Sequence, residues 1–330
     1  MWVVKPVSTL TEKERSAWER VELKLPLSQT LNWARAIEAV SGRTYLVFSP
    51  DEEVGGMVFS NTHGSTRLRF ECINGPFLHW DNPQSAPRQL ATFAMAVSKI
   101  DRNFGSLSLK PRWEKGVLNQ RLPFLPVDVF THTEAATLLV PVKQSEQEQF
   151  QDLSSRMRRT LSIARRNEVT VKWEKLTPAL LKQFVPTLKS FGESRGFTVP
   201  SLAWFEALIA EDLSSSSAST LTFWLVSSRK TNQTSLQSLA QLLVCIRGDR
   251  AHYLFGCETR ASELRSSIST STAAHWETIR QCASRGVKYY DLNGYLSDMN
   301  QDHPYYGVGQ FKSQFQGTIV RYEVPEFVVE

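Results

Sequence analysis

Long apolar runs are missing from this sequence. None of its 330 residues lies in a stretch of about 18 or more consecutive apolar residues, the length that a transmembrane helix needs. The opening segment, residues 1–6, also lacks the basic start, apolar stretch and cleavage site of a signal peptide. We therefore expect a cytoplasmic protein without a transmembrane segment, and peripheral contact with a membrane stays open.

Cysteine is scarce, and its spacing carries no motif. The four cysteines are Cys72, Cys245, Cys257 and Cys282, and their spacings fit neither a metal site nor a redox pair. Three of them lie inside apolar or helical patterns, so we interpret them as buried reduced thiols. We expect no metal.

A large excess of charge of one sign is also absent. The formal net charge is +5 and the isoelectric point is about 9.0. Such a mild basic balance permits a phosphate-rich partner without requiring one. The hydrophobic fraction of 41% is ordinary for a globular protein and argues against extensive disorder.

What the sequence does contain is an alternation of helical and strand patterns over a length that suits two domains. Apolar residues recur at helical spacing in some segments and with period two in others. In the first half we predict a helix at 28–37, an antiparallel meander of strands at 45–48, 55–60 and 67–73, a helix at 91–97, and strands at 106–109 and 136–142.

The second half repeats the order. We predict a helix at 145–167, a strand at 169–173, helices near 180–190 and 202–211, a loop at the serine run 214–217, strands at 221–226, 239–246 and 252–257, a long helix at 263–285 closed by Gly286, and a strand at 287–292. The predicted class is α/β (α+β), with two tandem units that each hold a mixed, largely antiparallel sheet flanked by helices. The first would span 1–143, completed by 317–330, and the second 144–316. No heptad pattern indicates a coiled-coil arm.

Several short motifs, in one order along nearly the whole chain, resemble the FemABX proteins. The second-domain pieces are Tyr253–Cys257 before the long helix, Gly286–Gly294 after it, and Gly309–Phe315. The other pieces are the helix with Gln29–Arg35, the turn Asn74–Phe77 and the basic segment 153–167.

FemABX proteins are peptidoglycan-bridge aminoacyltransferases built from two domains with the GNAT acyltransferase fold. The resemblance implies that an aminoacyl ester on tRNA is attacked by the amine of a peptidoglycan precursor stem peptide, a step of cell-wall biogenesis that supports cell shape. The first domain would bind the acceptor and the second the donor. Aminoacyl-tRNA, or acyl-CoA in some relatives, is then a co-substrate, and no other cofactor is expected.

The pair Phe311 and Lys312 matches the transfer site of the family. A fixed ammonium near an ester carbonyl would stabilise the developing oxyanion or a donor phosphate. From its residues alone, the pair between a glycine-rich loop and a strand is equally a core phenylalanine beside a surface lysine.

The first-domain candidates for acceptor binding are Arg35, Trp33 and Lys110. Arg35 matches the family position where a basic residue holds nucleotide-sugar phosphates, and an exposed helix arginine is the alternative interpretation. Lys110 stands where many members carry aspartate, and residues 199–200 are Val-Pro where nucleotide-sugar-binding relatives place a second arginine. These departures leave the acceptor open.

The segment 153–167 predicts a helix whose arginines point away from its apolar face. The candidates for binding the donor or another polyanion are Arg156, Arg158, Arg159, Arg165 and Arg166. Few carboxylates interleave with them, so contact with tRNA or donor phosphates is one interpretation, and a solvated basic face is the other. Any such contact should weaken with salt.

We add four cleft candidates: Tyr253, Asp291, Tyr305 and Tyr306. The two tyrosines 305 and 306 lie in a polar loop before the Phe-Lys pair, where an ordinary turn is the alternative, and Asp291 either orients an amine or caps a turn. His252 and His275 are interpreted as packed side chains. No general base is assigned.

Two other functions remain open. The first is acyl-CoA-dependent N-acyltransfer to a small-molecule or peptide amine, but residues 260–267 lack the glycines of a pyrophosphate-binding loop. The second is a non-catalytic RNA-binding protein that kept the fold. The sequence does not determine which amino acid is transferred, nor the oligomeric state.

Overall fold

The computed structural model describes residues 1–61, 67–82, 84–114, 133–213, 221–230, 239–258, 269–295, 301–302, 306–324 and 326–329. The chain forms two compact units. The first comprises Met1–Ala135, Ala203–Leu208 and Arg321–Glu330, and the second comprises Ala136–Leu202 and Ile209–Val320. We predicted domains at 1–143 with 317–330 and at 144–316, and these limits stay a prediction.

One mixed sheet organises the first unit. Its strands are β1 (Val3–Pro6), β2 (Thr44–Ser49), β3 (Val54–Asn61), β4 (Leu68–Ile73), β5 (Phe104–Lys110) and β14 (Phe327–Val329), in the order β1-β2-β3-β4-β5-β14. Only the β4–β5 pair of these six strands is parallel. The predicted meander of β2, β3 and β4 is therefore confirmed.

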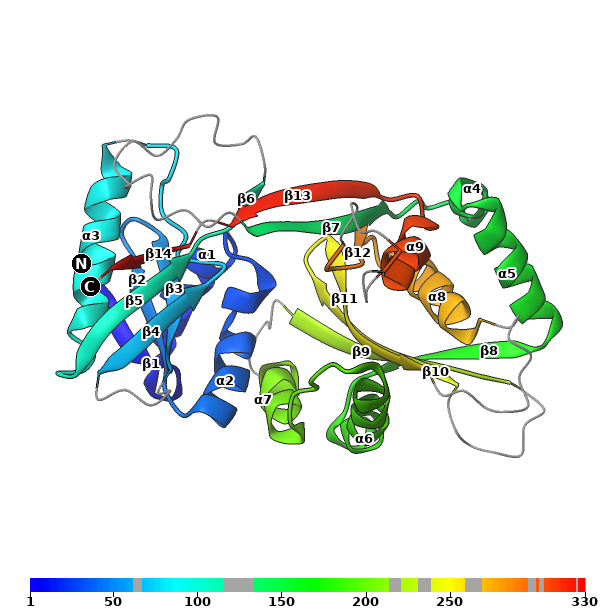
Figure 1. Cartoon of the computed structure of the whole chain (residues 1–330), viewed down its shortest axis with the longest axis horizontal. Helices are drawn as coiled ribbons and strands as arrows, with labels where there is room; N and C mark the ends of the chain where they lie inside the picture. The colour runs from blue at the N-terminus through cyan, green and yellow to red at the C-terminus, as the bar shows by residue number, and fades with distance from the viewer. Residues whose placement is uncertain are drawn as a thin grey trace. The chain divides into compact units, whose positions relative to one another are not determined.

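Helices cover both faces of this sheet (Figure 1). They are the 3₁₀ turns η1 (Val7–Thr9) and η2 (Leu27–Gln29) and the helices α1 (Glu12–Glu22), α2 (Leu31–Ser41) and α3 (Ser85–Ser98). Because side chains alternate along a strand, Phe48 of β2 packs with Trp18 of α1, whereas the neighbouring Val47 packs with Phe93 of α3. Both faces of β2 are thus buried.

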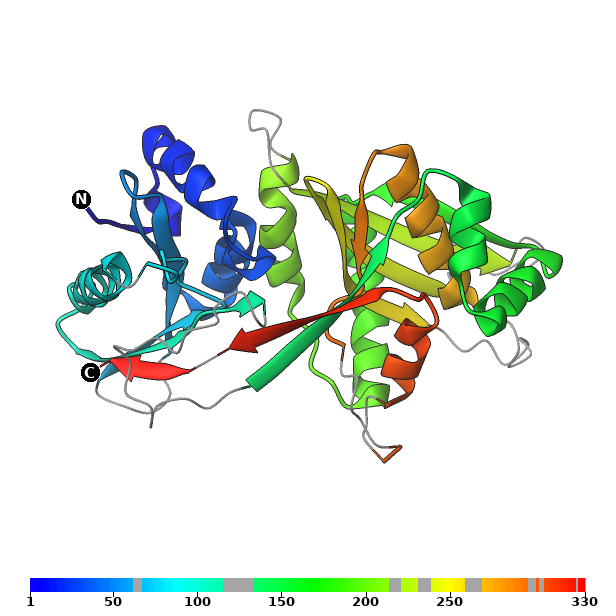
Figure 2. The same cartoon turned by 90° about the horizontal axis from the view of Figure 1, so that it is seen from above.

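The second sheet has the strand order β6-β13-β7-β12-β11-β10-β9-β8. Its strands are β6 (Trp113–Glu114), β7 (Thr133–Pro141), β8 (Val169–Lys175), β9 (Leu221–Lys230), β10 (Ala240–Arg247), β11 (Arg250–Glu258), β12 (Tyr289–Asp291) and β13 (Thr318–Val324). Strands β7 and β13 lie side by side (Figure 2). β11 and β12 are parallel, and the pairs from β8 to β11 and from β12 to β7 are antiparallel.

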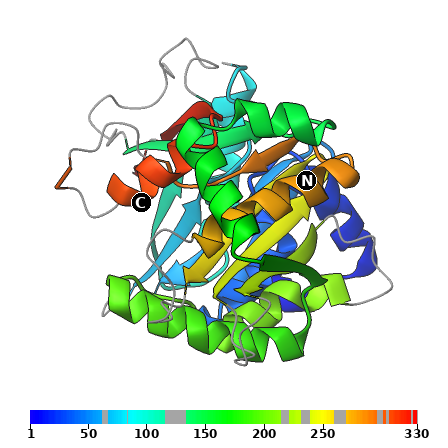
Figure 3. The ribbon, with the colours of Figure 1, turned by 90° about the vertical axis from the view of Figure 1, so that its right-hand side faces the viewer.

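Helices also cover both faces of the second unit's sheet (Figure 3). They are α4 (Glu146–Asp152), α5 (Ser155–Arg166), α6 (Pro178–Arg195), α8 (Thr270–Ser284) and α9 (Tyr306–Ser313). Helix α7 (Leu202–Leu213) is divided between the units, because Ala203–Leu208 belong to the first. Leu242 and Val244 of β10 share a core with Trp276 of α8, and Leu243 and Cys245, which are equally buried, face the other side. The predicted mixed α/β class is confirmed.

Two predicted helices differ from the observed ones. The single helix at 145–167 is wrong, because the chain breaks at Leu153 and Ser154 into α4 and α5. The Ser154 hydroxyl caps α5 by accepting from the Met157 N–H at 3.1 Å, and the Ser154 N–H donates to the Gln314 carbonyl at 3.1 Å. The long helix ends as predicted, before Gly286 with φ of 71°, and its observed start is Thr270. Residues 263–268 and the serine run 214–217 lie outside the described residues.

The segment before β13 is predicted as a loop that leads into a strand, and this prediction is wrong. Residues 306–313 form helix α9, although Gly307 and Gly309 give the segment a low helix propensity. Gly309 and Lys312 are buried, so packing of one helix face overrides the local preference.

Candidate active site

Lys312 lies on the buried face of α9, in the second unit. Its side chain is only 7% exposed, and the ammonium donates hydrogen bonds to the backbone carbonyl oxygens of Asn293 and of Gly294, the latter at 2.8 Å. The ammonium also lies 5.9 Å from the ring centroid of Tyr253. The lysine is therefore a fixed internal cation with three defined neighbours.

Burial changes the acidity of this lysine. Removal from water lowers the pKa of Lys312 to about 8, and the negative charge of Asp291 offsets part of that effect. The side chain keeps its proton at neutral pH by a small margin. A cation of this kind can stabilise a developing negative charge more strongly than one in water.

Asp291 ends β12 and is 3% exposed. Its carboxylate accepts hydrogen bonds from the Thr137 hydroxyl and from the Asn293 N–H, the latter at 2.9 Å. On its other side lie His252, with Nδ1 3.6 Å away, and Arg250, with a guanidinium nitrogen 3.8 Å away. The aspartate thus fixes the turn whose backbone carbonyls, those of Asn293 and Gly294, accept hydrogen bonds from the ammonium.

The site lies where two parallel strands stop pairing. β11 and β12 pair from Arg250 with Tyr289 to His252 with Asp291. The register of β11 against β10 then shifts, because Tyr253 pairs with Val244 and the next paired residue is Phe255. Beyond Asp291 the chain continues its pairing with β7, through the N–H groups of residues 292 and 295. Such a break in a sheet leaves backbone groups for other contacts.

His275 of α8 packs between the aromatic rings of the site. Its Nδ1 lies 2.8 Å from the Tyr290 hydroxyl, and its ring centroid lies 4.8 Å from that of Tyr253 and 5.4 Å from that of Phe311. Burial first, and then the charge of Lys312, lower the pKa of His275 to about 3. The ring is therefore neutral at physiological pH and packs beside the cation without adding a charge.

Some neighbours of Lys312 carry no sequence signal. The Asn293 and Gly294 carbonyls are backbone atoms, which side-chain patterns do not reveal. Tyr253 and Asp291, two of the predicted cleft candidates, lie beside the ammonium. Tyr306 begins α9 and is half-buried, and Tyr305 lies outside the described residues.

The acceptor candidates lie in the first unit. Arg35 is half-buried in α2, and Trp33 packs edge to face against Trp204 with ring centroids 5.1 Å apart. Lys110, at the end of β5, forms an ion pair with Glu326 at 3.1 Å. The contact with Glu326 occupies the Lys110 ammonium, so an acceptor phosphate would have to compete with that carboxylate.

The donor candidates on α5 divide into two groups. Arg158 is half-buried and donates to the backbone carbonyls of Gln151 and Leu153, both at 2.7 Å, so it ties α4 to α5. The exposed arginines are Arg156, Arg159, Arg165 and Arg166. These four side chains form the basic face of α5.

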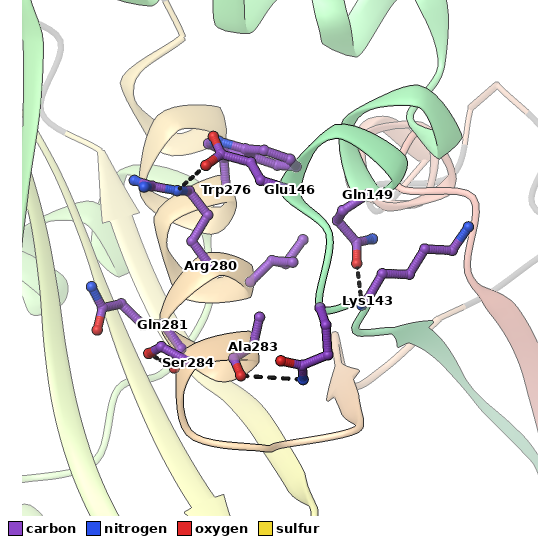
Figure 4. A pocket seen from close by; sticks show the side chains of 10 residues that line it. Lys143, Glu146, Gln149, Trp276, Arg280, Gln281, Ala283 and Ser284 are labelled. Carbon is purple, nitrogen blue, oxygen red and sulfur yellow. Dashed lines mark hydrogen bonds and ion pairs between the residues drawn. The ribbon is translucent and has the colours of Figure 1, made fainter.

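A pocket of about 270 Å³ lies between α8 and the start of α4 (Figure 4). Arg280 points toward Glu146 at 3.1 Å and also pairs with Glu277 at 2.9 Å. Lys143 pairs with Asp152 at 2.5 Å. Because both cations already have carboxylate partners, the pocket has little to offer an anionic ligand.

No group of three or more His, Cys, Asp or Glu side chains among the described residues is arranged to hold a metal ion. None of the described helices combines the length and the apolar character needed to cross a membrane. The segment 260–267, expected to lack a pyrophosphate-binding loop, lies outside the described residues.

The comparison with known proteins gives one family match. Residues 216–327, which contain β11, α8, β12 and α9, match the model of the FemAB family. Over this segment the chain is similar to FemAB proteins. This indicates an aminoacyltransferase. No curated protein matches the sequence.

Solved structures show the fold of this chain. It matches the crystal structure of FemX with a TM-score of 0.71 at 15% identity, over 98% of this chain and 96% of that one. The C-terminal domain of a putative lysylphosphatidylglycerol synthetase from Agrobacterium fabrum matches with a TM-score of 0.55 at 11% identity, over 94% and 91%. A tandem GNAT protein from the clavulanic acid biosynthesis pathway matches with a TM-score of 0.50 at 10% identity, over 100% and 98%. At these identities the likeness establishes a tandem GNAT-like fold and no substrate.

Proposed function

We propose that this FemABX-like chain transfers an amino acid from aminoacyl-tRNA to the amine of a peptidoglycan precursor stem peptide. The observation that carries the proposal is the buried ammonium of Lys312, fixed by two carbonyls inside the segment that matches the FemAB family. A charged lysine in such a place is costly for folding, which favours a functional reason for keeping it. The reaction would take place in the cytoplasm, where charged tRNA is available.

The proposed reaction is aminolysis of an ester. The acceptor amine attacks the ester carbonyl carbon, a C–N bond forms, and the carbonyl oxygen becomes negatively charged. The C–O bond to the terminal ribose of tRNA then breaks, and the ribose oxygen takes a proton that the amine loses. Lys312 would stabilise the charged oxygen between these two events.

Other residues have proposed roles that follow the resemblance. The exposed arginines of α5 would contact tRNA phosphates, because guanidinium groups bind phosphate with two parallel hydrogen bonds. Arg35, Trp33 and Lys110 would contact the acceptor. Phe311 would support Lys312 through its packing against His275.

The test compares two lysine substitutions in the second unit. Lys312→Met keeps the length of the side chain and removes its charge, and we expect kcat for transfer from aminoacyl-tRNA to fall about 10²-fold or more. Lys288→Met is the matched control, because Lys288 is an exposed lysine that lies 3.7 Å from Asp249. Wild-type turnover by Lys312→Met would contradict the assigned site.

The identity of the substrates needs a second experiment. Purified protein is incubated with each donor, aminoacyl-tRNA or acetyl-CoA, and each acceptor, a UDP-muropeptide or phosphatidylglycerol vesicles, and product is detected by mass spectrometry. We expect product from aminoacyl-tRNA and the muropeptide. Product from acetyl-CoA alone would favour the acyl-CoA-dependent alternative, and tRNA binding without any product would favour a non-catalytic RNA-binding protein.

A further inference from the structure

Asn293 connects three elements around the Lys312 ammonium. Its backbone carbonyl accepts a hydrogen bond from Lys312 on α9. Its N–H donates to the Asp291 carboxylate at the end of β12, at 2.9 Å. Its side-chain Nδ2 donates to the backbone carbonyl of Tyr253 on β11, at 2.7 Å. Asn293 is half-buried, and its three hydrogen bonds thus connect it to three different elements of the site.

The side-chain bond spans the gap between the strands. β11 and β12 pair only as far as His252 and Asp291, and after that point the chain follows β7. Leu292 and Tyr295 donate to β7 carbonyls at 3.0 and 2.8 Å, so the turn between them is fixed on its β7 side. The Asn293 amide fixes the same turn on its β11 side.

The backbone of Asn293 is in the left-handed region, with φ of 50°. Most side chains avoid this region, and asparagine tolerates it better than most residues. This conformation lets the chain leave β12 and turn two successive carbonyls, at 293 and 294, toward Lys312. Strained backbone of this kind is typical of sites where geometry matters for function.

The charged and titratable groups around Lys312 come from three directions. Asp291 lies on β12 and is contacted by His252 and Arg250 of β11. Tyr253 on β11 and His275 on α8 border the ammonium with their rings. None of these side chains is bonded to Lys312 in the structure, whereas the Asn293 carbonyl is.

We propose that Asn293 is a positioning residue for the transfer reaction, with its carbonyl aiming the Lys312 ammonium and its side chain fixing that carbonyl against β11. This inference rests on the proposed transferase function. It assigns a role to a residue that does not touch the substrate. The consequence is that loss of the amide group should disturb Lys312 although every atom of Lys312 remains.

The decisive variant is Asn293→Gly. Glycine adopts the left-handed backbone without strain, so the turn can persist while the bond to Tyr253 is removed. We expect kcat to fall about tenfold and KM to stay within about twofold, because the defect lies in the alignment of the ammonium. The matched control is Asn74→Gly in the first unit, where φ is 57° and Nδ2 donates to the Ser28 hydroxyl at 2.8 Å. The control should keep wild-type kcat.

A second variant makes the role visible in the pH dependence of Lys312. In Asn293→Gly the carbonyl of residue 293 remains but loses the support of the bond to Tyr253, so it should bind the ammonium less well and the pKa of Lys312 should fall below its present value of about 8. In Asn293→Asp the added carboxylate should raise that pKa, although the bond to Tyr253 is also removed. The two shifts of opposite sign are measured by NMR titration of ¹³C-labelled lysine, which needs no substrate.

The outcomes separate this inference from the proposed function. Unchanged kcat and an unchanged Lys312 titration in Asn293→Gly would overturn the positioning role, even if Lys312→Met is inactive. Wild-type turnover by Lys312→Met would overturn the proposed function itself. If Asn293→Gly melts well below the Asn74→Gly control, both variants are titrated at a temperature where each is folded: a lowered Lys312 pKa in Asn293→Gly supports the role, and an unchanged pKa rejects it.

Discussion

Lys312 carries a charge in a place where charge is unfavourable. A buried ammonium without partners would lose its proton, because desolvation favours the neutral amine. Burial lowers the pKa of Lys312 to about 8, the negative charge of Asp291 offsets part of that effect, and two backbone carbonyls accept hydrogen bonds from the ammonium. The pKa of Lys312 therefore lies close to neutral pH, so small changes in the surroundings of the side chain alter its average charge.

The first prediction concerns the pH dependence of transfer. The pKa of Lys312 lies near 8, below the 10.5 of an exposed lysine, so the ammonium is present below about pH 8 and is lost as the pH rises through that value. If the ammonium stabilises the transition state, kcat should decline above about pH 8. Lys312→Arg should remove this decline, since a guanidinium stays charged. An identical alkaline decline in both proteins would show that another group titrates.

The second prediction concerns stability and His275. The pKa of this buried histidine is lowered from 6.5 to about 3, so its neutral form is favoured by folding. Stability from this source is present above about pH 6.5 and is lost as the pH falls toward 3, because the unfolded chain binds the proton first. The maximum slope is about 1.4 kcal/mol per pH unit. Urea denaturation between pH 7 and 4 measures how the free energy of unfolding changes with pH, and this change should be smaller for His275→Asn than for the wild type. Equal changes would show that the pKa of His275 is not lowered by folding.

At the scale of elements, helix α5 combines a structural and a functional face. Leu161 and Ala164 pack inward, and Arg158 is consumed by bonds to the carbonyls that end α4. The other four arginines are exposed. Their substitution should therefore disturb the unit less than substitution of Arg158.

The third prediction tests these arginines as a tRNA-binding surface. In Arg159→Gln/Arg166→Gln the affinity for tRNA should fall, and the slope of log Kd against log salt should decrease by about one for each phosphate that the protein no longer neutralises. Filter binding at several salt concentrations measures both. Lys189→Gln on α6 is a control at another exposed cation. If Lys189→Gln and the double variant give the same slope of log Kd against log salt, the basic face of α5 is a solvated surface that does not contact tRNA.

At the scale of the whole molecule, the C-terminal segment completes the first unit. β14 pairs antiparallel with β5, so Val328 lies opposite Ser108 at the sheet edge. Glu326 accepts from the Ser108 hydroxyl at 3.0 Å and pairs with Lys110 at 3.1 Å. The last residues of the chain thus fold with segments that lie more than 200 positions earlier.

The fourth prediction follows from this closure. A chain that ends at Val324 lacks β14, which leaves β5 as an unpaired edge. Amide hydrogen exchange should become about tenfold faster or more at those positions of 107–109 whose N–H faces β14, because their partners on that side are removed while the pairing with β4 remains. Glu326→Gln keeps the strand and removes only half-exposed ion pairs, so it should change exchange little. Slow exchange in the shortened chain would mean that β14 adds little to the unit.

Sequence patterns predicted the fold class and most strands, because the period of apolar residues along a segment is a local property. They failed for α9, where glycines hide a helix that only packing stabilises, and at Ser154, where a capping hydroxyl divides a continuous helical pattern. The Phe-Lys pair was selected from its resemblance to a family, and its role stays a proposal.

The sequence by itself determined a tandem α/β class, and its motifs, which resemble those of the FemABX proteins, pointed to a basic helix and a lysine worth testing. Only the tertiary structure decided what surrounds that lysine. Tyr253 lies 40 positions before Asn293, and Asn293 lies 19 positions before Lys312; the three residues meet because β11, β12 and α9 converge where strand pairing ends. No local pattern encodes such a meeting, since it depends on strand order and on backbone carbonyls that every residue possesses.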